Sequence, residues 1–150
     1  SPLSSSSAAS DVYKRQAEDP MGGGQRLDAD RLQQLPAELA KRPQAFSVLA
    51  FAGGQPVGLV NCFEGFSTFA CRPLVNIHDV VVLDSYRGQG LSKRLLQKVE
   101  DIARQRGCCK VTLEVLEGNA QAQAAYRACG FANAMLDPTH GRMLFWSKAL

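Results

Sequence analysis

The turn Arg87-Gly88-Gln89-Gly90 is the stretch whose residue types point most clearly to chemistry. It follows the apolar run Val80–Leu83 and precedes a helical pattern that starts at Leu91. At such a junction the backbone N–H groups at the start of the helix point to one spot that carries partial positive charge. Glycines let a ligand approach the backbone, and the arginine adds a positive charge. The turn therefore predicts a binding site for an anionic group such as a phosphate.

The turn matches neither of two common phosphate-binding patterns. GxxxxGK[ST] is absent and so is GxGxxG, which disfavours a site for nucleoside triphosphates or dinucleotides. Glycines also occur in strand-to-helix turns for structural reasons alone. The tetrapeptide by itself leaves the binding and the structural interpretations open.

The elements around the turn form a strand, a helix and a second strand. Residues 74–83 are rich in β-branched residues, and their unbroken end Val80–Leu83 predicts a strand buried on both faces. Apolar residues form one stripe from Gly90 to Arg106, which predicts an amphipathic helix that Gly107 ends. Residues 109–116 alternate in the manner of a strand. A strand, helix and strand in succession predict a right-handed parallel crossover.

The segment before this crossover predicts a helix and a hairpin. Residues 28–43 carry Leu32, Leu35 and Leu39 at helical spacing, and we expect Pro36 to split this segment into two short pieces. Two apolar runs surround Gly53-Gly54-Gln55, which predicts an antiparallel hairpin. Antiparallel and parallel pairs together make the predicted sheet mixed.

The segment after the crossover predicts a helix and a final strand. Asn119 is a candidate N-cap, and Gly130 closes the helix. Residues 140–150 read as a last strand. The expected fold is thus α/β, with a mixed, twisted central sheet and helices on both faces.

Bulk properties set limits on function. The 150 residues correspond to one domain, and no stretch is apolar for long enough to cross a membrane. The net charge of +3 is scattered along the chain, which argues against nucleic acid as a partner. Five cysteines without a CxxC pair, and only two histidines, predict no metal site. We interpret the cysteines as reduced thiols, which suggests a cytoplasmic protein.

Two sequence blocks together resemble the GNAT family of N-acetyltransferases. "IHDVVVLDSYRGQGLSKRLL" resembles the family pattern [QR]-x-x-G-x-[GA], which binds the pyrophosphate of acetyl-coenzyme A. Arg87 to Leu91 fit the pattern, and Ser92 stands where it has Gly or Ala. "VTLEVLEGNAQAQAAYRACGF" resembles the family signature N-x-x-A-x-x-x-Y-x-x-x-G-F. The resemblance runs from Ala45 to Leu150.

The resemblance implies acetyl-CoA as the acetyl donor and the acyl-CoA N-acyltransferase fold, with the first strand missing or truncated. It implies that the strand Val80–Val82 splays from the next strand, opens a slot for the pantetheine arm and offers a backbone N–H to the acetyl carbonyl. The residues that it assigns to the cofactor are Val80, Val81, Val82, Arg87, Gly88, Gln89, Gly90, Leu91, Ser92 and Asn119.

Two residues are candidates for proton transfer. The resemblance makes Tyr126 the acid that protonates the departing thiolate, and Asn119 lies two helical turns earlier on the same helix face. His78 falls where family members often carry the base, and an imidazole titrates close to neutral pH. Strand alternation sends His78 and Asp79 to opposite faces, so Asp79 could orient His78 only across a bulge. Each candidate also has a structural explanation: Tyr126 could pack its helix onto the sheet, His78 could be half-buried and bonded to a neighbouring backbone group, and Asn119 could serve capping alone.

The acceptor side is less well defined by the sequence. Glu64 could pair with a substrate ammonium while Phe66 and its aromatic neighbours hold it, or Glu64 could be a solvated loop carboxylate. The expected partner is a small-molecule or peptide amine, and a homodimer could cover an incomplete N-terminal sheet edge. The alternative function is a non-catalytic coenzyme A sensor or partner-binding module with the same fold.

The N-terminal end differs in composition from the rest of the chain. Residues 1–20 are rich in serine, and we expect them to be disordered. Composition changes sharply after Gln16, and residues 1–16 resemble translated cloning or adaptor sequence, so we interpret them as foreign to the native protein. The predicted N-acetyltransferase domain is therefore 21–150.

Overall fold

The computed structural model describes Val12, residues 28–134 and residues 137–150. Its elements, in chain order, are α2 (Ala29–Ala40), β1 (Ala45–Ala52), β2 (Gln55–Ser67), β3 (Arg72–Val82), the 3₁₀ turn η2 (Asp84–Tyr86), α3 (Leu91–Gln105), β4 (Val111–Leu113), α4 (Ala120–Ala128) and the 3₁₀ turn η3 (Pro138–His140). No helix in the described ranges is both long and apolar enough to cross a bilayer.

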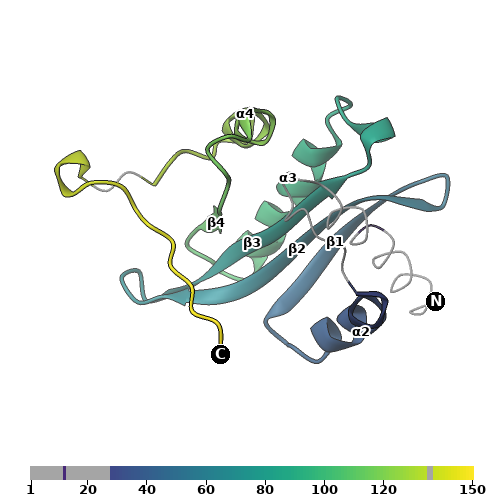
Figure 1. The fold of residues 1–150 in the computed structure, drawn as a ribbon, viewed down its shortest axis with the longest axis horizontal. Helices are drawn as coiled ribbons and strands as arrows, with labels where there is room; N and C mark the ends of the chain where they lie inside the picture. The colour runs from purple at the N-terminus through teal and green to yellow at the C-terminus, as the bar shows by residue number, and fades with distance from the viewer. Residues whose placement is uncertain (1–11, 13–27, 135–136) are drawn as a thin grey trace.

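The strands form one twisted sheet in the order β1-β2-β3-β4 (Figure 1). β1 and β2 pair antiparallel, as do β2 and β3, whereas β3 and β4 pair parallel. The mixed sheet and its parallel crossover through α3 are therefore confirmed. Gly53 and Gly54 form the β1–β2 turn with φ of 55° and 76°, a backbone that favours glycine and produces the expected hairpin.

Helices cover both faces of the sheet, as predicted. The apolar stripe of α3 packs on one face, and the buried residues of this cluster are Val60, Cys62, Val75, Ile77, Leu95, Leu96, Val99 and Ala103. α2 packs on the opposite face, where Leu32 meets Leu59 and Val81. Val12 belongs to this second cluster and is only 1% exposed. The rest of the segment predicted to be disordered and foreign lies outside the described residues.

The prediction that Pro36 divides the first helix is wrong. α2 runs without a break from Ala29 to Ala40 with Pro36 inside it. A proline in a helix interior removes one backbone hydrogen bond and costs about 3 kcal/mol. Burial of Leu32, with Leu35 and Leu39 packed beside it, offsets that cost.

The prediction of a last strand over residues 140–150 is also wrong. His140 ends η3, and the residues after it belong to no helix or strand. The segment is apolar enough for a strand, but a strand also needs a neighbour for its backbone groups. Trp146 in this segment is 83% exposed and therefore does not pack against the sheet.

Candidate active site

A gap opens between β3 and β4 where their pairing stops. The parallel ladder joins Val75 to Val111, Asn76 to Thr112 and Ile77 to Leu113, and ends there. β3 continues to Val82, still paired to β2 on its other side. The ladder therefore ends before Val80–Val82, where the resemblance implies that the two strands splay. Beyond Ile77, the edge of β3 that faced β4 has no strand partner among the described residues.

The backbone of β3 presents polar groups to this gap. The Leu83 amide donates to the Val57 carbonyl at 3.0 Å, so Leu83 and, by alternation, Val81 direct their backbone groups to β2. Val80 and Val82 consequently direct theirs to the gap. The side chain of Val81 is buried on the α2 face, whereas those of Val80 and Val82 pack on the α3 face.

The turn after β3 has the geometry of an anion site. Gly88 and Gly90 have φ of 74° and 76°, and a side chain at either position would project into open space. The first backbone bond of α3 runs from the Arg94 amide to the Gly90 carbonyl at 3.2 Å. The amides that precede it at the start of the helix have no partner within the helix. The open space in front of them could accept a phosphate.

The charges around this turn favour an anion as well. The first turn of α3 contains no acidic residue but does contain Lys93 and Arg94, whereas a helix N-terminus is normally stabilised by negative charge. The Arg87 side chain is fixed nearby: its Nε donates to the Val82 carbonyl at 3.2 Å, and its guanidinium pairs with Asp84 at 3.0 Å. These residues fit a pyrophosphate group.

The remaining predicted cofactor residues lie around the same turn. Gln89 is exposed and donates from its side chain to the Ser85 carbonyl at 3.2 Å. Leu91 packs against the core cluster, and Ser92 is half-buried at the start of α3. Asn119 caps α4 through its side chain, which accepts from the Ala122 amide at 3.1 Å. This hydrogen bond agrees with the interpretation of Asn119 as the N-cap of α4.

Tyr126 lies on the face of the sheet that α3 covers. It packs against the core cluster and against Phe131, with ring centroids 6.1 Å apart. Burial raises the pKa of its phenol, because a phenolate loses water contacts there. Tyr126 is therefore a protonated hydroxyl at neutral pH.

His78 lies on the opposite face because β3 is bulged at this residue. Asn61 pairs with Asp79 and Cys62 with Ile77, so His78 is the extra residue between them. Its ring lies 4.6 Å from that of Phe63, centroid to centroid. His78 and Asp79 therefore share a face, and the expectation that alternation separates them is corrected.

A polar row holds Asp79 in place on this face. Ser47 donates to the Asn61 side-chain oxygen at 3.0 Å, and the Asn61 amide donates to Asp79 at 3.2 Å. Asn61 is only 4% exposed, so these bonds satisfy an otherwise buried amide. Sequence alternation alone gave no sign of this row, because it depends on the register of three strands.

Glu64 and Phe66, the two predicted acceptor contacts, lie further along β2. Glu64 pairs with Arg106 at 3.0 Å, and Arg106 also lies over the Phe46 ring at 4.4 Å from its centroid. The carboxylate thus shares the α3 face with that arginine, away from His78 and Phe63. Phe66 is 60% exposed near the end of the strand.

Three further polar residues, Asn76, Thr112 and Glu114, lie where the ladder ends and were not singled out from the sequence. The Asn76 amide donates to the Thr112 hydroxyl at 3.0 Å and to the Glu114 carboxylate at 3.2 Å. The alternation Val-Thr-Leu-Glu, which begins in β4, could have placed Thr112 and Glu114 on one face, but not beside Asn76 of β3. That neighbourhood depends on where the ladder ends.

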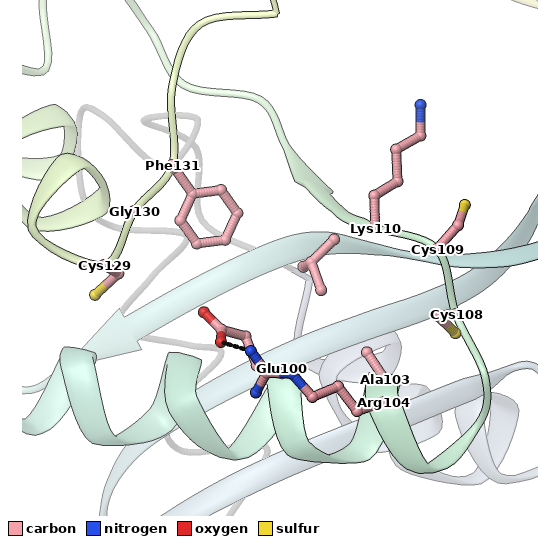
Figure 2. A pocket seen from close by; sticks show the side chains of 10 residues that line it. Glu100, Ala103, Arg104, Cys108, Cys109, Lys110, Cys129, Gly130 and Phe131 are labelled. Carbon is pink, nitrogen blue, oxygen red and sulfur yellow. Dashed lines mark hydrogen bonds and ion pairs between the residues drawn. The ribbon is translucent and has the colours of Figure 1, made fainter.

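A cavity of about 320 Å³ lies away from the predicted site residues, beside the second half of α3 (Figure 2). Its lining comes from α3, the start of β4 and the end of α4, and includes Cys108, Cys109 and Cys129. None of the predicted catalytic or cofactor residues lines it. Within the described ranges, no group of three or more His, Cys, Asp or Glu side chains could hold a metal ion.

The mixed sheet and the glycine turn agree with the family that the two sequence blocks indicated. The family model described as "Acetyltransferase (GNAT) family" matches residues 9–131. The chain belongs to this family, as the two sequence blocks indicated.

Relatives with assigned activities match part of the chain. Thialysine N-epsilon-acetyltransferase of Bos taurus is 33% identical over 84 residues, which are 53% of this chain and 49% of that protein. Streptothricin acetyltransferase of Streptomyces lavendulae is 39% identical over 75 residues, 50% of this chain and 40% of that protein. The match thus spans about half the length of these relatives, or less.

Solved structures share the fold over almost the whole chain. A putative acetyltransferase from Agrobacterium tumefaciens str. C58 has a TM-score of 0.77 at 22% identity, covering 99% of this chain and 96% of that chain. An aminoglycoside N-acetyltransferase in complex with CoA has a TM-score of 0.74 at 19% identity, covering 97% of this chain and 89% of that chain. Identity at this level supports the fold alone.

Proposed function

We propose that this protein transfers an acetyl group from acetyl-CoA directly to a primary amine of a small molecule or peptide. The observation that carries the proposal is the combination of the gap beside Val80–Val82 with the open, cationic turn at Gly88 and Gly90. The relatives support it, since thialysine N-epsilon-acetyltransferase and streptothricin acetyltransferase are both named for acetyl transfer.

The glycine turn would hold the donor. Acetyl-CoA supplies an acetyl group activated as a thioester. The amides at the start of α3, with Arg87 and Lys93, would bind its pyrophosphate. The backbone groups of Val80 and the amide of Val82 would bind the pantetheine arm and the acetyl carbonyl, because they face the gap and have no strand partner there, whereas the Val82 carbonyl already accepts from Arg87. Asn119 would contact the same arm from the start of α4.

His78 and Tyr126 would move the protons. His78 lies at the start of the gap on the α2 face, where its imidazole could take a proton from the acceptor amine. Tyr126 lies on the α3 face and keeps its proton at neutral pH, so it could protonate the departing sulfur. A base and an acid on opposite faces of one gap would act on the two sides of the reacting carbonyl.

Direct transfer is favoured over a cysteine relay. Cys62 is buried in the core, and Cys108, Cys109 and Cys129 line the cavity beside α3 rather than the gap. None of these thiols is placed to accept an acetyl group from the gap, and Cys71 precedes the start of β3, at the opposite end of that strand from Val80–Val82. The free cysteines agree with a reducing, cytoplasm-like setting.

Acetyl-CoA binding in the variant Gly90→Glu tests the anion site. The new carboxylate would project into the open space where the phosphates are expected, so we expect calorimetry to show a loss of at least about tenfold in affinity. Gly90→Ala is the matched control, because it introduces the same backbone strain at φ 76° without the charge. Equal affinities of Gly90→Glu and Gly90→Ala would contradict the assignment.

A further inference from the structure

Residues 141–150 form an apolar arm that the fold leaves exposed. The consecutive large apolar side chains Met143–Trp146 are 67% to 91% exposed, and Leu150 is fully exposed as well. No backbone hydrogen bond joins the arm to any other residue that the structure describes. Figure 1 draws the arm as the yellow segment that ends at the C-terminus. A contiguous exposed apolar surface of this kind is typical of a protein–protein contact.

The strand β4 has an outer edge with unpaired backbone groups. It is the last strand of the sheet, and its neighbour is β3 alone. The Lys110 carbonyl accepts from the Val75 amide at 3.1 Å, so Lys110 and, by alternation, Thr112 direct their backbone groups to β3. Val111 and Leu113 consequently direct theirs outward, where no strand of the described ranges meets them. An edge of this kind is a template for a further strand.

Apolar surface lies around this edge. Val115 and Leu116, which follow β4, are 41% and 59% exposed. On the α3 side, the cavity of about 320 Å³ is lined by the start of β4 together with Ala103 and Phe131. Side chains alternate along a strand, so an arm paired with β4 would present apolar residues of Met143–Trp146 to both faces of the sheet.

The arm and the edge are complementary in two copies of the chain. Each copy carries both features, so two copies related by a two-fold axis would exchange arms and leave neither feature exposed. Phe145 and Trp146 would each bury about 150–250 Å². Over two arms and the surfaces that they cover, this is on the order of 1,600 Å², the size of a stable interface. In the structure the arm pairs with no described strand of its own sheet.

We propose that the protein forms a dimer in which residues 141–150 of each copy add a strand to the outer edge of β4 of the other copy. This dimer goes beyond the proposed function, since it requires neither acetyl-CoA nor an acceptor. It also differs from a dimer that covers the N-terminal edge, because β1 and β4 are at opposite ends of the sheet.

Sedimentation equilibrium tests the dimer. We expect the parent chain to be dimeric at about 10 µM and Phe145→Ser to raise the dissociation constant by about tenfold or more. Phe69→Ser is the matched control, because Phe69 is a comparably exposed phenylalanine in the turn between β2 and β3, outside the proposed interface. It should dimerise like the parent. A chain that ends at Gly141 should be monomeric, and circular dichroism checks that each variant is folded.

Hydrogen exchange identifies the surfaces that meet in the dimer. On dilution from dimer to monomer, peptides that cover residues 109–116 and 142–150 should lose protection together. A parent that stays monomeric at about 100 µM would overturn the proposal, even if the arm is protected within its own chain. A dimer that persists without the arm, or that Phe69→Ser weakens as much as Phe145→Ser, would also overturn it.

Discussion

Tyr126 and His78 lie on opposite faces of the sheet although the sequence blocks suggest one common site. Tyr126 packs against Phe131 on the α3 face, and His78 lies on Phe63 on the α2 face. β3 and β4 are no longer paired beyond Ile77 and Leu113, so a reacting group bound between them could meet both side chains. The bulge at His78 is what places the histidine there.

Removal of the Tyr126 hydroxyl should affect turnover and not donor binding. If Tyr126 is the acid, Tyr126→Phe should lower kcat by about 100-fold or more, since positioned proton transfer contributes on that order. Acetyl-CoA affinity by calorimetry should stay within about twofold of the parent, because the ring and its packing remain. An unchanged kcat would remove Tyr126 from this role.

The same substitution has a second, independent effect on stability at alkaline pH. Burial raises the pKa of Tyr126 in the folded state, so the unfolded chain releases this proton first as pH rises. The stability contributed by the protonated phenol is therefore present below the ordinary pKa near 10 and is lost as pH rises through the folded value. Urea unfolding at pH 9 and 11 should show a smaller loss in Tyr126→Phe than in the parent.

At the scale of elements, the position of α3 depends on one close approach to β2. A Cβ added at Gly58 would lie 3.0 Å from Leu95 Cδ1 and 3.3 Å from the Val81 carbonyl oxygen. Gly58 is paired with Val82, at the gap end of β3. The lack of a side chain at this position lets the start of α3, and with it the glycine turn, lie close to the sheet.

We therefore expect Gly58→Ala to destabilise the protein by about 1–3 kcal/mol, the usual cost of overpacking a core. The free energy of unfolding in urea measures it. Gly65→Ala is the matched control, because it lies in the same strand and its Cβ would meet Leu74 Cδ1 at an ordinary 3.6 Å. Equal stabilities of the two variants would mean that Leu95 moves aside at no cost.

The sequence predicted elements well where a local signal existed. Asn119 and Gly130 mark the ends of α4, and the two glycines of the β1–β2 turn mark the hairpin. It failed where the outcome depends on distant partners. Pro36 lies inside a helix that packing supports, and residues 141–150 are strand-like but have no strand partner.

The residues of the candidate site fall into the same two groups, those with a local sequence signal and those that depend on distant partners. The glycine turn is a local motif, so its residues were found in the sequence. The His78 bulge and the Asn76–Glu114 contact arise from the register of strands far apart in the chain, which no local pattern encodes. The family resemblance supplied Tyr126, which packs on the core between α3 and the sheet and against Phe131 just after its own helix.

At the scale of the whole molecule, one core between the sheet and α3 supports the site. Cys62 lies in this core and is completely buried, whereas Cys71 is exposed in the turn between β2 and β3. Burial raises the pKa of the Cys62 thiol to about 12, because the thiolate would lose its solvation. The two thiols therefore report on the folded core and on the surface of the same molecule.

At neutral pH an alkylating reagent should modify Cys71 rapidly in the native protein and Cys62 only when the core opens, as mass spectrometry of the labelled peptides can measure. Because the folded pKa of Cys62 exceeds the ordinary thiol value, its contribution to stability is complete below about pH 8.5 and is lost as pH rises toward 12. Labelling of Cys62 should accordingly accelerate with pH more steeply than thiolate formation in the unfolded chain would explain.

In a Cys62→Ala variant, which is less stable overall, the free energy of unfolding should fall less between pH 8 and pH 10 than in the parent. Rapid native-state labelling of Cys62 at neutral pH would show that the core between β2 and α3 opens readily, and the glycine turn at the start of α3 could not then be a rigid anion site.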